Sequence, residues 1–116
     1  MVLGNVFPVK WRGLISENEL APNEVQVRKI LGRLVGAAKI NGRIYVFDGR
    51  CPHAGRSLQD SEVTPQGTLV CPGHGLKLAL GPQPCSVNAV PLAQSSFRVR
   101  NGTVQVDWRS LRKKRP

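Results

Sequence analysis

Alternating apolar and polar residues predict several short strands along the chain. Residues 24–30, EVQVRKI, alternate as a half-buried strand does. Two further apolar runs follow, GRLVGAAKI at 32–40 and RIYVF at 43–47. The pattern therefore predicts three consecutive strands in the first half of the chain.

Two Asn-Gly pairs predict tight hairpin turns. The first pair, at 41–42, separates the second and third of these strands. The second pair, at 101–102, separates SFRVR at 96–100 from TVQVDW at 103–108. Both central positions of such a turn require a positive φ, which Asn and Gly adopt more readily than other residues. We therefore expect antiparallel pairing of the strands on either side of each turn.

Shorter segments complete an all-β prediction. An edge strand is expected at 7–11, and a short strand at 67–70, GTLV, leads toward a cysteine. Only SENEL at 16–20 is typical of a helical turn, with Ser16 as its candidate N-cap and Pro22 beyond its end. The predicted fold class is all-β, with antiparallel sheets.

Chain length and apolar content limit the possible architecture. The 116 residues suffice for one domain, expected over 1–108, and RSLRKKRP at 109–116 is expected to be a flexible basic tail. No stretch approaches the roughly 20 apolar residues that span a bilayer, and the N-terminus lacks the pattern of a secretion signal. We therefore expect a soluble, cytoplasmic protein.

The chain is strongly basic, with a net charge of +10 from 17 basic and seven acidic residues. A charge of this size favours acidic partners of some kind. Nucleic acid, an anionic membrane surface and solubility alone are equally open explanations of the charge.

Cysteine and histidine residues carry the strongest chemical signal. Three cysteines are an odd number and too few for a disulfide scaffold. The only two histidines each lie within three residues of a cysteine, in CPH at 51–53 and CPGH at 71–74. The full spacing is C-x-H-x17-C-x2-H, and a glycine closely follows each half. Two matched loops of this composition predict one shared metal or redox site.

This spacing resembles the signature of the Rieske 2Fe-2S proteins, over about 7–107 of the chain. A Rieske cluster has two thiolates on one iron and two imidazoles on the other. The resemblance implies one 2Fe-2S cluster per chain, with Cys51 and Cys71 on the inner iron. His53 and His74 would bind the outer iron. It also implies a Rieske-like antiparallel β-sandwich with a small cluster-binding subdomain formed by the two loops.

Within that family the chain is similar to the stand-alone ferredoxins of multicomponent oxygenase systems. The resemblance implies a one-electron carrier from an NAD(P)H-dependent flavoprotein reductase to a terminal oxygenase, often one that hydroxylates aromatic rings. Both contacts would be transient and electrostatically steered, with no membrane, nucleic-acid or small-molecule partner. The chain itself would not be an enzyme, because protein donors fill all four cluster positions and no nucleophile is paired with a base.

The loop residues have expected structural roles. Gly55, Gly73 and Gly75 are candidates to bring backbone N–H groups close to the cluster sulfurs. Pro52 and Pro72 are expected to stiffen the loops, so that both redox states keep one geometry.

Two other functions fit parts of the pattern. The small Rieske-like subunit of assimilatory nitrite reductase has a similar length, and stable co-purification with a large sirohaem subunit would identify it. Two thiolates and two imidazoles also suit structural zinc in a nucleic-acid-binding module, which iron analysis would distinguish.

Several positions bear on partners and potential. Cys85 lies outside both loops and is expected to be a spare thiol, and Arg56 is either a docking residue or a solvated loop charge. This sequence departs from the ferredoxins at Leu78, because they commonly carry an aromatic residue near this position. High-potential Rieske proteins have a loop-to-loop disulfide at the positions of Arg56 and Gly73. They also have a serine at the position of Leu76. Without the disulfide and the serine hydroxyl, a low reduction potential is expected.

Overall fold

The computed structural model describes residues 11–52, 55–65, 67–72, 75–80 and 89–107. The strands in this part are β1 (Trp11–Ser16), β2 (Val25–Ile30), β3 (Arg33–Ile40), β4 (Arg43–Asp48), β5 (Glu62–Val63), β6 (Thr68–Val70), β7 (Lys77–Ala79), β8 (Val90–Pro91), β9 (Phe97–Arg100) and β10 (Thr103–Asp107). They form sheets in the orders β1-β10-β9, β2-β3-β4 and β5-β6-β7-β8. Neighbouring strands are antiparallel except β7 and β8, so the all-β prediction is confirmed.

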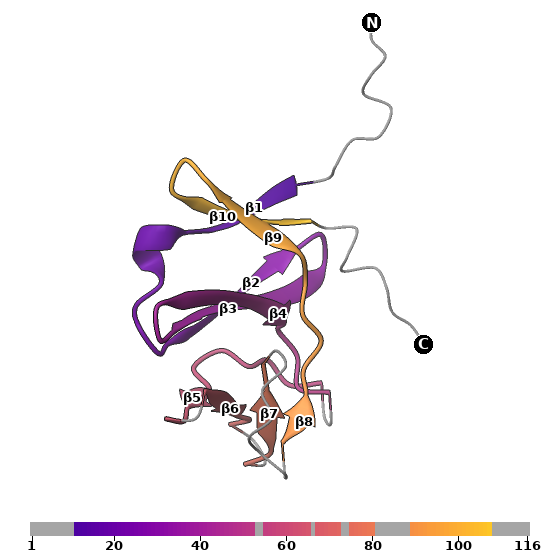
Figure 1. The fold of residues 1–116 in the computed structure, drawn as a ribbon. Helices are drawn as coiled ribbons and strands as arrows, with labels where there is room; N and C mark the ends of the chain where they lie inside the picture. Colours follow the sequence, from indigo (N-terminus) through magenta and orange to yellow (C-terminus); the bar gives the residue numbers. More distant parts are fainter. Residues whose placement is uncertain (1–10, 53–54, 66, 73–74, 81–88, 108–116) are drawn as a thin grey trace, which may run out of the picture.

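The β2-β3-β4 sheet is the central layer, between the β1-β10-β9 sheet and the small β5–β8 sheet (Figure 1). Successive side chains of a strand point to opposite faces. On β3, Val35 and Ala37 therefore pack with Val104 and Val106 in one core, whereas Ala38 packs in a second core. The second core also contains Leu69, Leu78 and Leu80. Burial on both faces explains why β3 is apolar almost throughout instead of alternating.

Both predicted Asn-Gly turns are confirmed. Asn41 and Asn101 have φ of 54° and 53°, and Gly42 and Gly102 have φ of 80° and 76°. A third two-residue turn joins β2 to β3 with the same backbone signs. Its first central residue is a leucine, which sequence analysis did not identify as a turn residue.

The N-terminal region departs from the prediction. The first described strand begins at Trp11 and extends to Ser16, and positions 7–10 of the predicted strand lie outside the described residues. The pairing of β1 with β10 shifts register between Gly13 and Ile15. This irregularity buries both Leu14 and Ile15, so buried and exposed residues do not alternate along β1. The alternation pattern therefore does not predict this strand.

The predicted helical turn is a 3-10 turn at Glu17–Glu19. Ser16 occupies the N-cap position, but its side chain makes no capping hydrogen bond, so that part of the prediction is wrong. No helix in the described part of the chain is long and apolar enough to cross a membrane.

Candidate metal centre

Each predicted cysteine ligand lies at the start of a short hairpin loop. Cys51 follows β4 after two residues, and Cys71 directly follows β6. Arg50 pairs with Ser57 at the base of the first loop, and Val70 pairs with Lys77 at the base of the second. Each closing position of the second loop lies 20 residues after its counterpart in the first. The two loops therefore have the same length between their closing pairs.

The backbone hydrogen bonds of the two loops are also the same. In each loop the cysteine N–H donates to the carbonyl five residues later, and the N–H of the glycine four residues later donates to the cysteine carbonyl. These N···O distances are 2.8 and 2.7 Å in the first loop and 2.8 and 2.9 Å in the second. The histidines do not follow the offset, because His53 is two residues after its cysteine and His74 is three residues after.

The glycine of this motif is required by backbone conformation. Gly55 and Gly75 both have φ of 72°, and a Cβ on either would contact nothing within 4 Å. The left-handed backbone, and not a lack of space, therefore favours glycine here. Their N–H groups were expected to face cluster sulfurs, but each donates to a cysteine carbonyl instead. The third candidate, Gly73, lies outside the described residues.

Cys51 and Cys71 lie in one apolar core although the loops that follow them are exposed. Each is 1% exposed, and both belong to the core that contains Phe47 and Leu58. The two cysteines are not joined in a disulfide. By contrast, Pro52 and the residues at 55–57 are exposed. The surrounding core thus shields both cysteine side chains from water.

Part of the predicted ligand set is outside the described residues. His53 and His74 are not described, and neither is Cys85. Among the residues that are described, no group of three or more His, Cys, Asp or Glu side chains gathers at one place. The structure therefore brings Cys51 and Cys71 into one core. The ligand set of Cys51, His53, Cys71 and His74 stays a prediction.

The two loops share a surface hollow. It has a volume of about 420 Å³, and its described lining is Arg56, Ser57 and Gln59 from the first loop side and Pro72 from the second. Arg56 is exposed at this rim. The neighbourhood of Arg56 and Pro72 shows that the loops face the same region of surface.

Gln59 connects the first loop to the free edge of the central sheet, a role that sequence analysis missed. Its Oε1 accepts a hydrogen bond from the Val27 N–H at 2.7 Å, and its Nε2 donates to the Val25 carbonyl at 3.5 Å. β2 is an edge strand. The side-chain amide therefore pairs with β2 as a neighbouring strand would, and it fixes the residues after the loop to the sheet.

We expect Gln59→Leu to lower the free energy of unfolding by about 1–3 kcal/mol, because it leaves the part-buried Val27 N–H without its acceptor. Chemical denaturation followed by circular dichroism measures this. Gln94→Leu is the matched control, since Gln94 is exposed and makes no side-chain hydrogen bond within the described part of the chain. Equal stability of the two variants would contradict the assigned role of Gln59.

Comparison with known proteins places the fold and the loops in context. The family model of the Rieske [2Fe-2S] domain matches residues 10–105. The ferredoxin component of the alkene monooxygenase system of Xanthobacter autotrophicus is 26% identical over 106 residues, which are 90% of this chain and 87% of that protein. Cholesterol 7-desaturase nvd of Xenopus laevis is 30% identical over 71 residues, which are 60% of this chain but 16% of that protein.

Solved structures share the fold at lower identity. The ferredoxin of carbazole 1,9a-dioxygenase from Nocardioides aromaticivorans has a TM-score of 0.68 and 17% identity, covering 84% of this chain and 96% of that chain. A ferredoxin in a carbazole 1,9a-dioxygenase complex with its oxygenase has a TM-score of 0.70 and 20% identity, covering 85% and 94%. These structural matches show that the chain shares the fold of both ferredoxins.

Proposed function

Because the chain belongs to the Rieske [2Fe-2S] domain family, we propose that it carries one electron at a time from an NAD(P)H-dependent flavoprotein reductase to a terminal oxygenase. The supporting observation is the share of each relative that the chain matches. It matches 87% of the alkene monooxygenase ferredoxin but only 16% of the cholesterol desaturase, so its length corresponds to the ferredoxin. On this proposal the chain is a carrier and not an enzyme. The terminal oxygenase is proposed to be one that hydroxylates aromatic rings.

The residues of the two loops fit an iron–sulfur cluster. Cys51 and Cys71 supply two thiols that are buried in one apolar core. We propose that they bind one iron of a single 2Fe-2S cluster and that His53 and His74 bind the other, since two thiolates and two imidazoles form the Rieske donor set. When bound, such a cluster accepts and releases one electron.

The protein's own contribution is a rigid and partly dry setting for these donors. Matching hydrogen bonds at 2.7–2.9 Å close both loops, which limits rearrangement between redox states. The apolar core behind Cys51 and Cys71 excludes water from the sulfur side. The exposed residues at 55–57 leave the opposite side accessible to a partner.

We also propose the organisation and setting of the chain. We propose one domain over 1–108, of which the family model matches 10–105. The predicted basic tail at 109–116 lies outside the described residues. The odd cysteine count and the use of two thiols at the cluster favour the reducing environment of the cytoplasm.

Reconstitution tests the proposed function. The purified chain should contain two irons and show a brown colour. It should be reduced by NAD(P)H through a flavoprotein reductase and reoxidised by a terminal oxygenase with substrate turnover. Bound zinc without iron would support the nucleic-acid module instead. A stable complex with a sirohaem subunit would support the nitrite reductase alternative.

Electron transfer is expected to slow as salt rises, because the chain carries a net charge of +10. Exposed charges are screened beyond about 8 Å at physiological ionic strength, so steering of an acidic partner weakens. Stopped-flow rates between low and physiological salt measure this effect. Truncation of 109–116 separates the contribution of the tail, and a salt-independent rate would exclude electrostatic steering.

The reduction potential is expected near the low end of the Rieske range, at about −150 mV. Leu76 packs against the core that contains Cys51 and Cys71, so this position offers an apolar side chain and no hydroxyl donor. Arg56 excludes a loop-to-loop disulfide at its position. Fewer donors stabilise the added negative charge less, which disfavours reduction. Protein-film voltammetry measures the midpoint, and a value well above zero would reopen a quinol-linked function.

A further inference from the structure

The turn between β2 and β3 carries a leucine where the two described Asn-Gly hairpin turns carry asparagine. Leu31 has φ of 51°, against 54° for Asn41 and 53° for Asn101. Asparagine tolerates this left-handed backbone, whereas in leucine the Cβ crowds the following carbonyl. The local conformation therefore disfavours leucine at this position.

Packing does not offset this conformational disadvantage. Leu31 is 57% exposed, and it belongs to neither apolar core of the described residues. An asparagine would satisfy the same turn and would expose less apolar surface. Packing among the described residues thus gives no reason for leucine here, and a residue in an unfavourable backbone conformation often has a functional contact.

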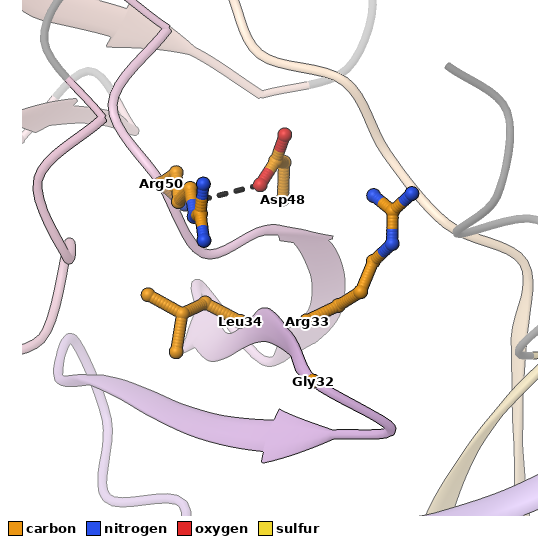
Figure 2. Close-up of a pocket in the computed structure, with 5 residues that line it drawn as sticks. All are labelled: Gly32, Arg33, Leu34, Asp48 and Arg50. Carbon is orange, nitrogen blue, oxygen red and sulfur yellow. Dashed lines mark hydrogen bonds between the residues drawn. The ribbon is translucent and has the colours of Figure 1, made fainter. Parts of the chain in front are cut away.

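A basic pocket lies directly beside this turn (Figure 2). It has a volume of about 280 Å³, and its described lining is Gly32, Arg33, Leu34, Asp48 and Arg50. Figure 2 shows the side chains of Arg33 and Arg50 on opposite sides of Asp48. The pocket thus combines two guanidinium groups with one carboxylate.

The two guanidinium groups are not neutralised within the described structure. Asp48 Oδ1 accepts a hydrogen bond at 3.1 Å from the backbone N–H of Arg50. The salt bridge between described residues joins Arg28 to Glu19. Neither Arg33 nor Arg50 forms a salt bridge with a described residue. Guanidinium groups bind carboxylates with paired hydrogen bonds. The pocket is therefore suited to a carboxylate supplied from outside.

We propose that Leu31 and the Arg33–Arg50 pocket form one docking surface for a protein redox partner. The partner presents an acidic side chain to the two arginines and an apolar hollow to Leu31. The inference rests on the proposed function as an electron carrier. Because Arg50 directly precedes Cys51, a partner held at this surface contacts the base of the first loop.

The combination of features favours a protein over other occupants. A free anion or a nucleic-acid phosphate would use the arginines but would gain nothing from an exposed leucine. A second copy of the chain would bring a net charge of +10 against an equal charge. Protein interfaces combine apolar contact with arginine–carboxylate pairs, as this surface requires.

The test compares Leu31→Asn, Arg33→Gln and Arg50→Gln with the wild-type chain, each loaded with its cluster. The control is Arg43→Gln, an equal loss of charge at an exposed residue at the opposite end of β4. The readout is the half-saturating carrier concentration, measured separately with the flavoprotein reductase and with the terminal oxygenase. Thermal denaturation of Leu31→Asn is measured in parallel.

We expect each of the three variants, and not Arg43→Gln, to raise the half-saturating concentration for one partner by about fivefold. The effect of the arginine variants should shrink at high salt, whereas that of Leu31→Asn should persist. Leu31→Asn should also raise the denaturation midpoint, because it relieves the turn.

Two results would overturn the inference. One is a lower denaturation midpoint for Leu31→Asn, since leucine would then serve folding. The other is normal wild-type turnover with the same half-saturating concentration in every variant. Absence of turnover with the wild-type chain itself would instead refute the proposed function, and the docking surface would fall with it.

Discussion

Cys51→Ser and Cys71→Ser are each expected to abolish the visible absorption of the reconstituted protein and all electron transfer. A neutral hydroxyl does not replace an anionic thiolate on iron. Each cysteine is 1% exposed, so a solvent molecule does not reach the vacated position from the protein side and replace the lost ligand. Iron content and the visible spectrum of the purified variants measure the loss.

Cys85→Ser is the control for this pair, because it removes a thiol outside both loops. It should retain the colour and the iron. Circular dichroism should show that both loop variants keep their strands, since serine is close to cysteine in size. Loss of colour in the Cys85 variant, or its retention in either loop variant, would contradict the proposed ligand set.

Gly36→Ala is expected to destabilise the fold by about 3 kcal/mol. A Cβ on Gly36 would lie 2.4, 2.9 and 3.0 Å from three ring atoms of Phe47. That ring is 0% exposed and packs in the core that holds Cys51 and Cys71, so it has little room to move. Denaturant unfolding measures the change, and the cluster should also be lost faster.

Gly13→Ala is the matched control, because Gly13 is also in a strand and its added Cβ would lie at an ordinary 3.6 Å from Thr103 Cγ2. A smaller side chain opposite Gly36 should relieve the overlap, so Phe47→Leu and Gly36→Ala together should be less destabilising than their sum. Additive effects of these two substitutions would show that the ring does not cause the loss.

The two cysteine loops repeat one backbone arrangement. Both hairpins close at equivalent positions with equivalent hydrogen bonds, and both hold a glycine at φ of 72°. The sequence shows part of this repeat, because the cysteine, the following proline and the glycine recur after 20 residues, whereas the histidines at 53 and 74 break this offset. The backbone pairing shows that the two cysteines are structurally equivalent.

Local signals determined what the sequence predicted correctly. The Asn-Gly pairs located two hairpins because positive φ at two successive positions is a strictly local requirement. The Cys-His spacing indicated the Rieske family because cluster ligation demands particular side chains at short separations. The all-β fold class followed from these features and from the apolar runs.

The tertiary structure decided the features that depend on contacts between distant residues. The irregular pairing of β1, the amide of Gln59 on β2 and the pocket between Arg33 and Arg50 all arise where separate segments meet. The leucine at position 31 reads as an ordinary apolar residue until its backbone angle and exposure are known. Periodicity and spacing report only what neighbours along the chain require, whereas burial and pairing depend on which segments the fold brings together.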